Sequence, residues 1–147
     1  MSDIEVATEI FEDYDEVLKS GLGVIPNPTH IFSAEKSMHV YYEVYNLTKN
    51  EFGQTLYRVT YQVEPLEEKR KFFGKVLRSI GKVVKEERKE TVMISTEQTG
   101  YREDQNEFLE LDVSKSEPGE FRLTLTIVDL VADQTISKLT NFRVVTQ

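Results

Sequence analysis

The sequence predicts an all-β protein: an antiparallel two-sheet β-sandwich of the immunoglobulin-like kind, with about seven or eight strands and one short inserted helix. Short runs of alternating apolar and polar residues recur along the chain, and proline, glycine and small polar residues separate them. The length of 147 residues and the 39% share of hydrophobic residues are typical of one globular core. No linker or change of composition divides the chain, so residues 1–147 are predicted to form a single domain.

The central prediction concerns residues 38–47, a long run of strand-forming residues. Alternation places Val40, Tyr42 and Val44 on one face and His39, Tyr41, Glu43 and Tyr45 on the other. Residues 56–64 alternate in the same way after a polar loop. We expect the two runs to form an antiparallel hairpin at the centre of one sheet.

The N-terminal part of the chain is less regular. Residues 3–7 are predicted as an edge strand. The spacing of Ile10, Tyr14, Val17 and Leu18 fits one or two helical turns, and irregular structure fits equally well. The two prolines of residues 25–28 then require an extended or turning backbone.

Residues 66–84 change the pattern, because their apolar residues recur at helical spacing between lysines and arginines. Gly74 and Gly81 oppose a helix by about 1 kcal/mol each relative to alanine. The helix is the first interpretation, and a hairpin with its turn near residues 79–81 is its rival.

Strands resume in the C-terminal half, over residues 91–96, 108–113, 121–130 and 135–145. Proline and glycine at residues 118–119 mark a turn before the third of these. The inward positions on the first three strands are predicted to be Val92, Ile94, Leu109, Leu111, Val113, Phe121, Leu123, Leu125 and Ile127, and the last strand contains Phe142 and Val144.

Composition and motifs argue against catalysis. The chain has no cysteine, and its two histidines, His30 and His39, stand in no spacing typical of a zinc site. No glycine-rich phosphate loop and no Gly-x-Ser-x-Gly elbow is present. A net charge of −8 disfavours nucleic acid, and no apolar run reaches the length of a membrane span. We therefore predict no enzyme activity, no cofactor and no metal site.

The candidate ligand-binding residues are His39, Tyr41 and Tyr45. Two strand steps place the two tyrosine rings ~7 Å apart on one sheet surface. Such rings can stack on a sugar or form a patch for a protein. The favoured alternative is that residues 66–84 or the N-terminal region cover this face and bury both tyrosines.

Several segments together resemble a known family. They are the opening Ser2–Ala7, Ile25–Pro28 followed by Phe32, the strand Val40–Leu47, Pro118–Leu123, Val128–Asp129 and the closing Phe142–Val144. In this order they resemble the β-sandwich region found downstream of the GWxTD domain in uncharacterised exported bacterial proteins. The chain has no tryptophan, so the motif that names the family is absent, and the resemblance implies only the C-terminal sandwich module. It implies no catalytic residue.

The resemblance and the residues together predict a non-catalytic interaction or accessory module of an exported bacterial protein, excised from a longer parent chain. Its expected partner is a protein or a neighbouring domain, and its expected location is periplasmic or extracellular. The alternative is a carbohydrate-binding module that uses the aromatic face.

Overall fold

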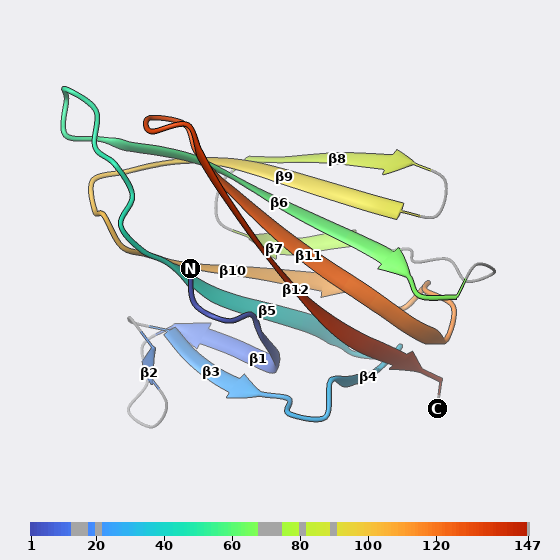
Figure 1. Cartoon of the computed structure of the whole chain (residues 1–147). Coiled ribbons are helices and arrows are strands. Elements are labelled where there is room, and N and C mark those ends of the chain that lie inside the picture. The colour runs from blue at the N-terminus through green and yellow to red at the C-terminus, as the bar shows by residue number, and fades with distance from the viewer. Residues whose placement is uncertain (13–17, 20–21, 68–74, 80–81, 89–90, 147) are drawn as a thin grey trace.

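The computed structural model describes residues 1–12, 18–19, 22–67, 75–79, 82–88 and 91–146, and these contain strands but no helix. The strands form two six-stranded sheets that pack face to face as a β-sandwich (Figure 1). Sheet A has the order β2 (Leu18–Lys19), β3 (Leu22–Pro26), β1 (Glu5–Glu12), β5 (Ser37–Val44), β10 (Gln105–Asp112) and β7 (Lys75–Ser79). Sheet B has the order β4 (Ile31–Ser33), β12 (Gln134–Val145), β11 (Gly119–Asp129), β6 (Thr55–Pro65), β9 (Thr91–Gly100) and β8 (Lys82–Arg88). The all-β sandwich is confirmed.

Neighbouring strands pair antiparallel, with the exception of β4 and the end of β12, which pair parallel. The longest ladder joins β11 to β12 from Gly119 opposite Val144 to Asp129 opposite Gln134. On its other side, β11 pairs with β6. These three strands are the centre and one flank of sheet B.

The main core lies between the sheets, and it is built from the alternate residues that the sequence predicted. All nine inward positions predicted for the C-terminal strands are buried, as are Phe142 and Val144 of β12 and Val40, Tyr42 and Val44 of β5. A period-two pattern assigns side chains to faces correctly because each β-strand turns alternate residues to opposite sides.

The predicted hairpin of residues 38–47 and 56–64 is wrong, although both strands and their faces are correct. β5 belongs to sheet A and β6 to sheet B, so the two strands face each other across the core. The hydroxyls of Tyr42 and Tyr61 meet there at 2.8 Å. Both strands present a fully apolar or aromatic face, and packing these faces together buries them in a way that side-by-side pairing would not.

The inserted helix is also wrong where the structure describes residues 66–84; residues 68–74 of this range lie outside the described part. Residues 75–79 form β7 beside β10 in sheet A, and residues 82–88 form β8 beside β9 in sheet B. The rival hairpin correctly anticipated two strands, but they pair with different sheets rather than with each other; residues 80–81 of the expected turn lie outside the described part. The edges of β10 and β9 offer backbone partners for extended chain, and glycine weakens the competing helix. The described residues form twelve strands, more than the predicted seven or eight, for this reason and because the N-terminal region adds several.

In the N-terminal region, β1 is an interior strand between β3 and β5 rather than an edge. Residues 10–12, where a helical turn was one option, belong to this strand, whereas residues 13–17 lie outside the described part. Residues 1–4 precede β1, and the amide of Ser2 donates to the carbonyl of Glu43 at 2.8 Å. Met1 and Ile4 pack against the main core.

Candidate functional site

His39 and Tyr41 lie on the outer face of sheet A, as predicted, whereas Tyr45 follows the end of β5 and lines a pocket with Val44 and Ile127, so the three do not form one exposed platform. Tyr41 is 3% exposed and belongs to a small second core with Ala7, Ile10, Val24 and Phe108. His39 is also buried, with its Nε2 3.6 Å from a carboxylate oxygen of Glu110. Tyr45, in contrast, is 43% exposed. The expected burial is therefore correct for Tyr41 and wrong for Tyr45, and the N-terminal strands β1 and β3 contribute to it from beside β5 in the same sheet.

Glu43 links the two tyrosines. The Tyr41 hydroxyl donates to Oε1 of Glu43 at 2.7 Å, and the Tyr45 hydroxyl donates to Oε2 of the same carboxylate. The hydrogen bond to Glu43 raises the pKa of Tyr45. One carboxylate thus fixes the orientation of an exposed ring by tying it to a buried one.

Tyr45 lines an open pocket of about 450 Å³ between the end of β5 and the β11–β12 hairpin. Apolar and polar side chains share the lining, which consists of Met1, Val44, Tyr45, Asn46, Leu47, Ile127, Asp129, Gln134, Thr135 and Ile136. We call it the Tyr45 pocket. Its lining has one carboxylate and, among the described residues, no lysine or arginine side chain.

The carboxylate of Asp129 holds the loops around the Tyr45 pocket in place. It accepts the amides of Thr48 at 2.9 Å, Val131 at 3.0 Å and Ala132 at 3.1 Å. Asn46, which has a φ of 58°, is tied by its amide to Asp104 at 3.0 Å. Because these loops are fixed by charged hydrogen bonds, the pocket is a pre-formed feature of the fold.

The edge of β12 beside this pocket is open. β4 covers β12 only from Arg143 to Val145, and no described residue pairs with the edge before Asn141. The amide of Arg143 donates to the carbonyl of His30, and the carbonyl of Asn141 accepts from His30 Nδ1. Backbone groups alternate in direction along an antiparallel strand, so those of Thr135, Ser137 and Leu139 also point away from β11.

Lys138 stands in the middle of this open edge. It pairs with Leu125 in the register, so its side chain starts on the core side of sheet B. Its Nζ lies 2.9 Å from Asp3, and this contact lowers the pKa of the Asp3 carboxyl. An inward-pointing charge is a device that protects edge strands from indiscriminate pairing.

Behind the Tyr45 pocket, the core between the sheets is polar. Glu107 of β10 is 2% exposed and accepts a hydrogen bond from the hydroxyl of Tyr57 of β6. Burial raises the pKa of Glu107 to about 7, and the Tyr57 hydrogen bond opposes this shift. Burial likewise raises the pKa values of Tyr42 and Tyr61.

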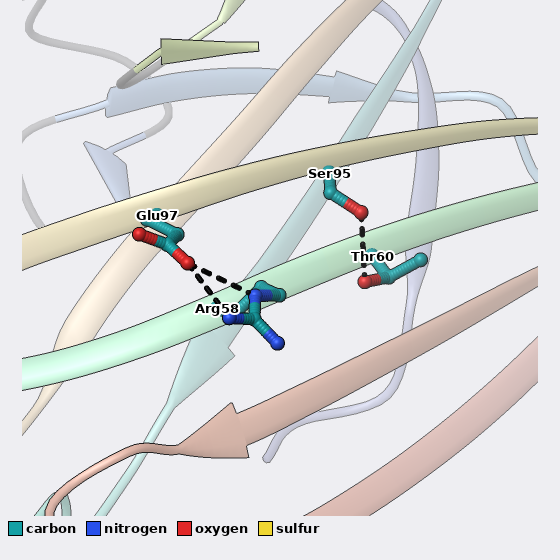
Figure 2. A network of polar contacts seen from close by, with 4 residues as sticks. All are labelled: Arg58, Thr60, Ser95 and Glu97. Carbon is teal, nitrogen blue, oxygen red and sulfur yellow. Dashed lines mark hydrogen bonds and ion pairs between the residues drawn. The ribbon is translucent and has the colours of Figure 1, made fainter. Parts of the chain in front are cut away.

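The outer face of sheet B is a hydrated surface with cross-strand polar pairs (Figure 2). Arg58 donates to Glu97 through Nε at 3.1 Å and Nη2 at 2.7 Å, and the hydroxyls of Thr60 and Ser95 lie 3.1 Å apart. Polar side chains on alternate positions of a half-exposed sheet are the ordinary solvent face of a sandwich. This part of the sheet B face therefore offers no apolar patch to a partner.

Other classes of site have no support among the described residues. No group of three or more histidine, aspartate or glutamate side chains could hold a metal ion there. In the same ranges, no helix is long and apolar enough to cross a membrane.

Comparison with known proteins gives structural likenesses alone. No family model matches the chain, and no curated protein matches it. One similar solved structure is a cohesin module from a family 33 glycoside hydrolase of Clostridium perfringens, with 9% identity, a TM-score of 0.45 and 100% of each chain covered. Another comes from work on fibronectin binding and biofilm formation by AAF fimbriae of enteroaggregative Escherichia coli, with 12% identity, a TM-score of 0.44, and 99% of this chain and 100% of the other covered. At such identities and scores, neither likeness says what this chain binds.

Sequence reasoning missed the open edge of β12 and the pocket beside it. One signal was available: the core-side positions of this strand include Lys138 and Thr140 between Ile136 and Phe142. Such a half-polar inward face is typical of an edge strand. The pocket itself had no local signal, because residues 44–47, 127–129 and 134–136 meet only in the folded chain.

Proposed function

We propose that the chain is a non-catalytic interaction module that binds a protein by accepting an extended segment at the open edge of β12. The observation that carries this proposal is the row of outward backbone groups at Thr135, Ser137 and Leu139 beside a pre-formed pocket. Addition of a strand to such an edge is a recurrent mode of peptide recognition, in which backbone hydrogen bonds supply affinity and pockets supply specificity.

Two further features support binding at this edge. Ile136 is 43% exposed and Leu139 is 59% exposed, so both faces of the strand offer apolar contact. Lys138 is already paired with Asp3, which leaves the edge without an uncompensated charge at its centre. An added strand would bury apolar surface and pair backbone groups without leaving the Lys138 ammonium buried and unpaired.

The setting that we propose is an exported bacterial protein, periplasmic or extracellular, in which the module binds a partner or a neighbouring domain of the parent chain. This part rests on the family resemblance of the sequence. Fractionation of cells that express the complete parent protein tests it, since a purely cytoplasmic distribution would contradict export.

The edge itself is tested by selecting linear peptides from a random display library on the immobilised domain. Ser137→Pro removes an edge amide that β11 does not use, and Ser137→Ala is the matched control, because it removes only the hydroxyl that contacts Thr126 at 2.8 Å. We expect the selected peptides to lose binding to Ser137→Pro and to keep it with Ser137→Ala. Peptides that bind both variants equally would contradict recognition at the β12 edge.

A second candidate function is saccharide binding in the Tyr45 pocket. Its supporting observation is an exposed ring beside the amides of Asn46 and Gln134, a combination that suits sugar rings and hydroxyls. A glycan array tests it: binding that is abolished by Tyr45→Ala and unchanged by Ser137→Pro would favour this function. Tyr41→Ala is no substitute for that test, because Tyr41 is buried and its truncation is expected to destabilise the domain.

A further inference from the structure

We infer that the segment accepted by β12 has a basic residue at its end beside the Tyr45 pocket and one apolar residue that enters this pocket. This inference rests on the proposed function and adds the chemistry of the partner segment. It follows from the length of the open edge, the shape of the neighbouring pocket and the distribution of charge around them.

The open edge sets the length of the segment. It runs from Thr135 to Leu139, five residues that span roughly 17 Å at the usual rise of a strand. At the far end of the edge, Nδ1 of His30 bonds the Asn141 carbonyl, and the His30 carbonyl accepts from the Arg143 amide. A longer partner segment would therefore collide with the residues before β4. The partner segment is therefore a short strand of ordinary length.

The pocket sets the central residue. An added residue that lies beside Ile136 shares its core-side orientation and stands over the Tyr45 pocket. Val44, Leu47 and Ile127 form apolar parts of the lining there. These three are already buried, and the exposed apolar surface of the lining belongs to Ile136 and Tyr45. An aliphatic side chain would remove part of that surface from water, at about 25 cal/mol per Å² of apolar area.

Charge sets the end of the segment that lies beside the pocket. Glu43 and Asp104 are hydrogen-bonded to the lining residues Tyr45 and Asn46, and Asp3 is paired with Lys138. The whole chain carries a net charge of −8. Lysine or arginine at this end of the segment therefore meets a favourable field, whereas the residue beside Lys138 is required to be uncharged.

Four synthetic peptides of about seven residues provide the test, with the length taken from the open edge. The first has lysine at both ends and a central leucine between strand-forming residues. The others replace the lysines by glutamate, replace the leucine by alanine, or methylate alternate backbone amides. Binding of each to the intact chain is measured by fluorescence anisotropy at low and high salt.

We expect the first peptide to bind, and to bind less tightly at high salt. The glutamate and alanine peptides should each bind roughly tenfold more weakly or worse, and the methylated peptide should not bind. Ile136→Lys should abolish binding by filling the pocket with a cation. Leu139→Lys is its matched control, because it adds the same charge to the outer face of the same strand and leaves the pocket unchanged.

The outcomes separate the two proposals. If the peptides bind through the Ser137 edge but prefer glutamate ends or ignore the leucine, the chemistry inferred for the segment is wrong and the proposed function stands. If no peptide shows binding that depends on Ser137, the proposed function fails as well. Concentration-dependent dimerisation in sedimentation that Ser137→Pro abolishes would show that a second copy occupies the edge, and would overturn the basic segment as its occupant.

Discussion

The two ends of the core between the sheets are built from different chemistry. At the end near β4, three phenylalanines pack together: Phe142 lies 5.6 Å from Phe121 in a stacked arrangement and 6.3 Å from Phe32 edge to face, between ring centroids. At the end near the Tyr45 pocket, Tyr42, Tyr57, Tyr61 and Glu107 place hydroxyls and a carboxyl inside the protein.

This difference shows which end of the core contributes to stability in the same way under all conditions and which end depends on protonation. A close-packed aromatic cluster contributes through buried area and ring contacts, and it has no dependence on pH. A buried carboxyl contributes only while its protonation and hydrogen bonds are satisfied. The open edge and the pocket lie beside the polar end, where strict apolar packing is already relaxed.

The largest expected effect is at the apolar end. Phe142→Ala removes a ring that contacts two others, and we expect it to lower the free energy of unfolding by about 3–5 kcal/mol. Urea denaturation followed by circular dichroism measures this change. Leu139→Ala, on the same strand but 59% exposed, is the control and should change stability by less than about 0.5 kcal/mol. Equal losses at the two positions would refute the assignment of faces on β12.

The next largest effect on the free energy of unfolding is expected at Glu107, and it depends on pH. Its pKa is raised in the folded protein from the ordinary 4.5 to about 7, so between these values the folded state holds more protons than the unfolded state. Stability from this group is therefore full below about pH 4.5, falls as the pH rises and levels off above about pH 7. At about 1.4 kcal/mol per pKa unit, the difference is about 3 kcal/mol.

Glu107→Gln isolates this contribution, because glutamine keeps an acceptor for Tyr57 and does not ionise. We expect the stability of the variant relative to the wild type to rise by about 3 kcal/mol between pH 4.5 and pH 8. Urea titrations at several pH values measure it, and the difference between the two proteins cancels the other carboxylates. A difference that stays constant with pH would show that Glu107 titrates normally.

Tyr57→Phe sharpens the same comparison with a smaller effect. It removes the hydroxyl that donates to Glu107 and leaves a buried carboxyl without that partner, at an expected loss of about 1–3 kcal/mol near neutral pH. It should also move the pH-dependent fall of stability to higher pH, because the Tyr57 hydrogen bond lowers the pKa of Glu107. A loss with no movement of the pH profile would mean that Tyr57 acts only by packing.

The smallest effect is expected on the outer face of sheet B, outside both ends of the core. Arg58→Ala breaks an ion pair whose side chains are 43% and 64% exposed, and such exposed pairs contribute about 0–1 kcal/mol. In thermal unfolding, the variant should be slightly less stable than the wild type at low salt. At high salt this difference should disappear, because salt screens the ion pair of the wild type. A loss comparable to that of Phe142→Ala would indicate that this face packs against something the domain needs.

The sequence by itself determined the class of fold and the direction of most strand side chains. Alternation of apolar and polar residues is a local property, so Val40, Leu123 and Phe142 could be placed inward without knowledge of their neighbours. The same property correctly placed Tyr41 on the outer face of β5, whereas Tyr45 lies beyond the end of that strand.

Only the tertiary structure decided which strands share a sheet and which side chains stay exposed. β5 and β6 could have paired or faced each other with the same pattern, and residues 75–79 and 82–88 became strands because β10 and β9 had free edges for them to pair with. Tyr41 and Tyr45 look equivalent in the sequence, but Tyr41 packs beside residues of β1, β3 and β10, whereas Tyr45 lies beyond the end of β5 and stays exposed. Burial, strand pairing and the Tyr45 pocket depend on residues far apart in the chain. A local pattern contains no information about which distant strand will pair with a given strand or pack against it.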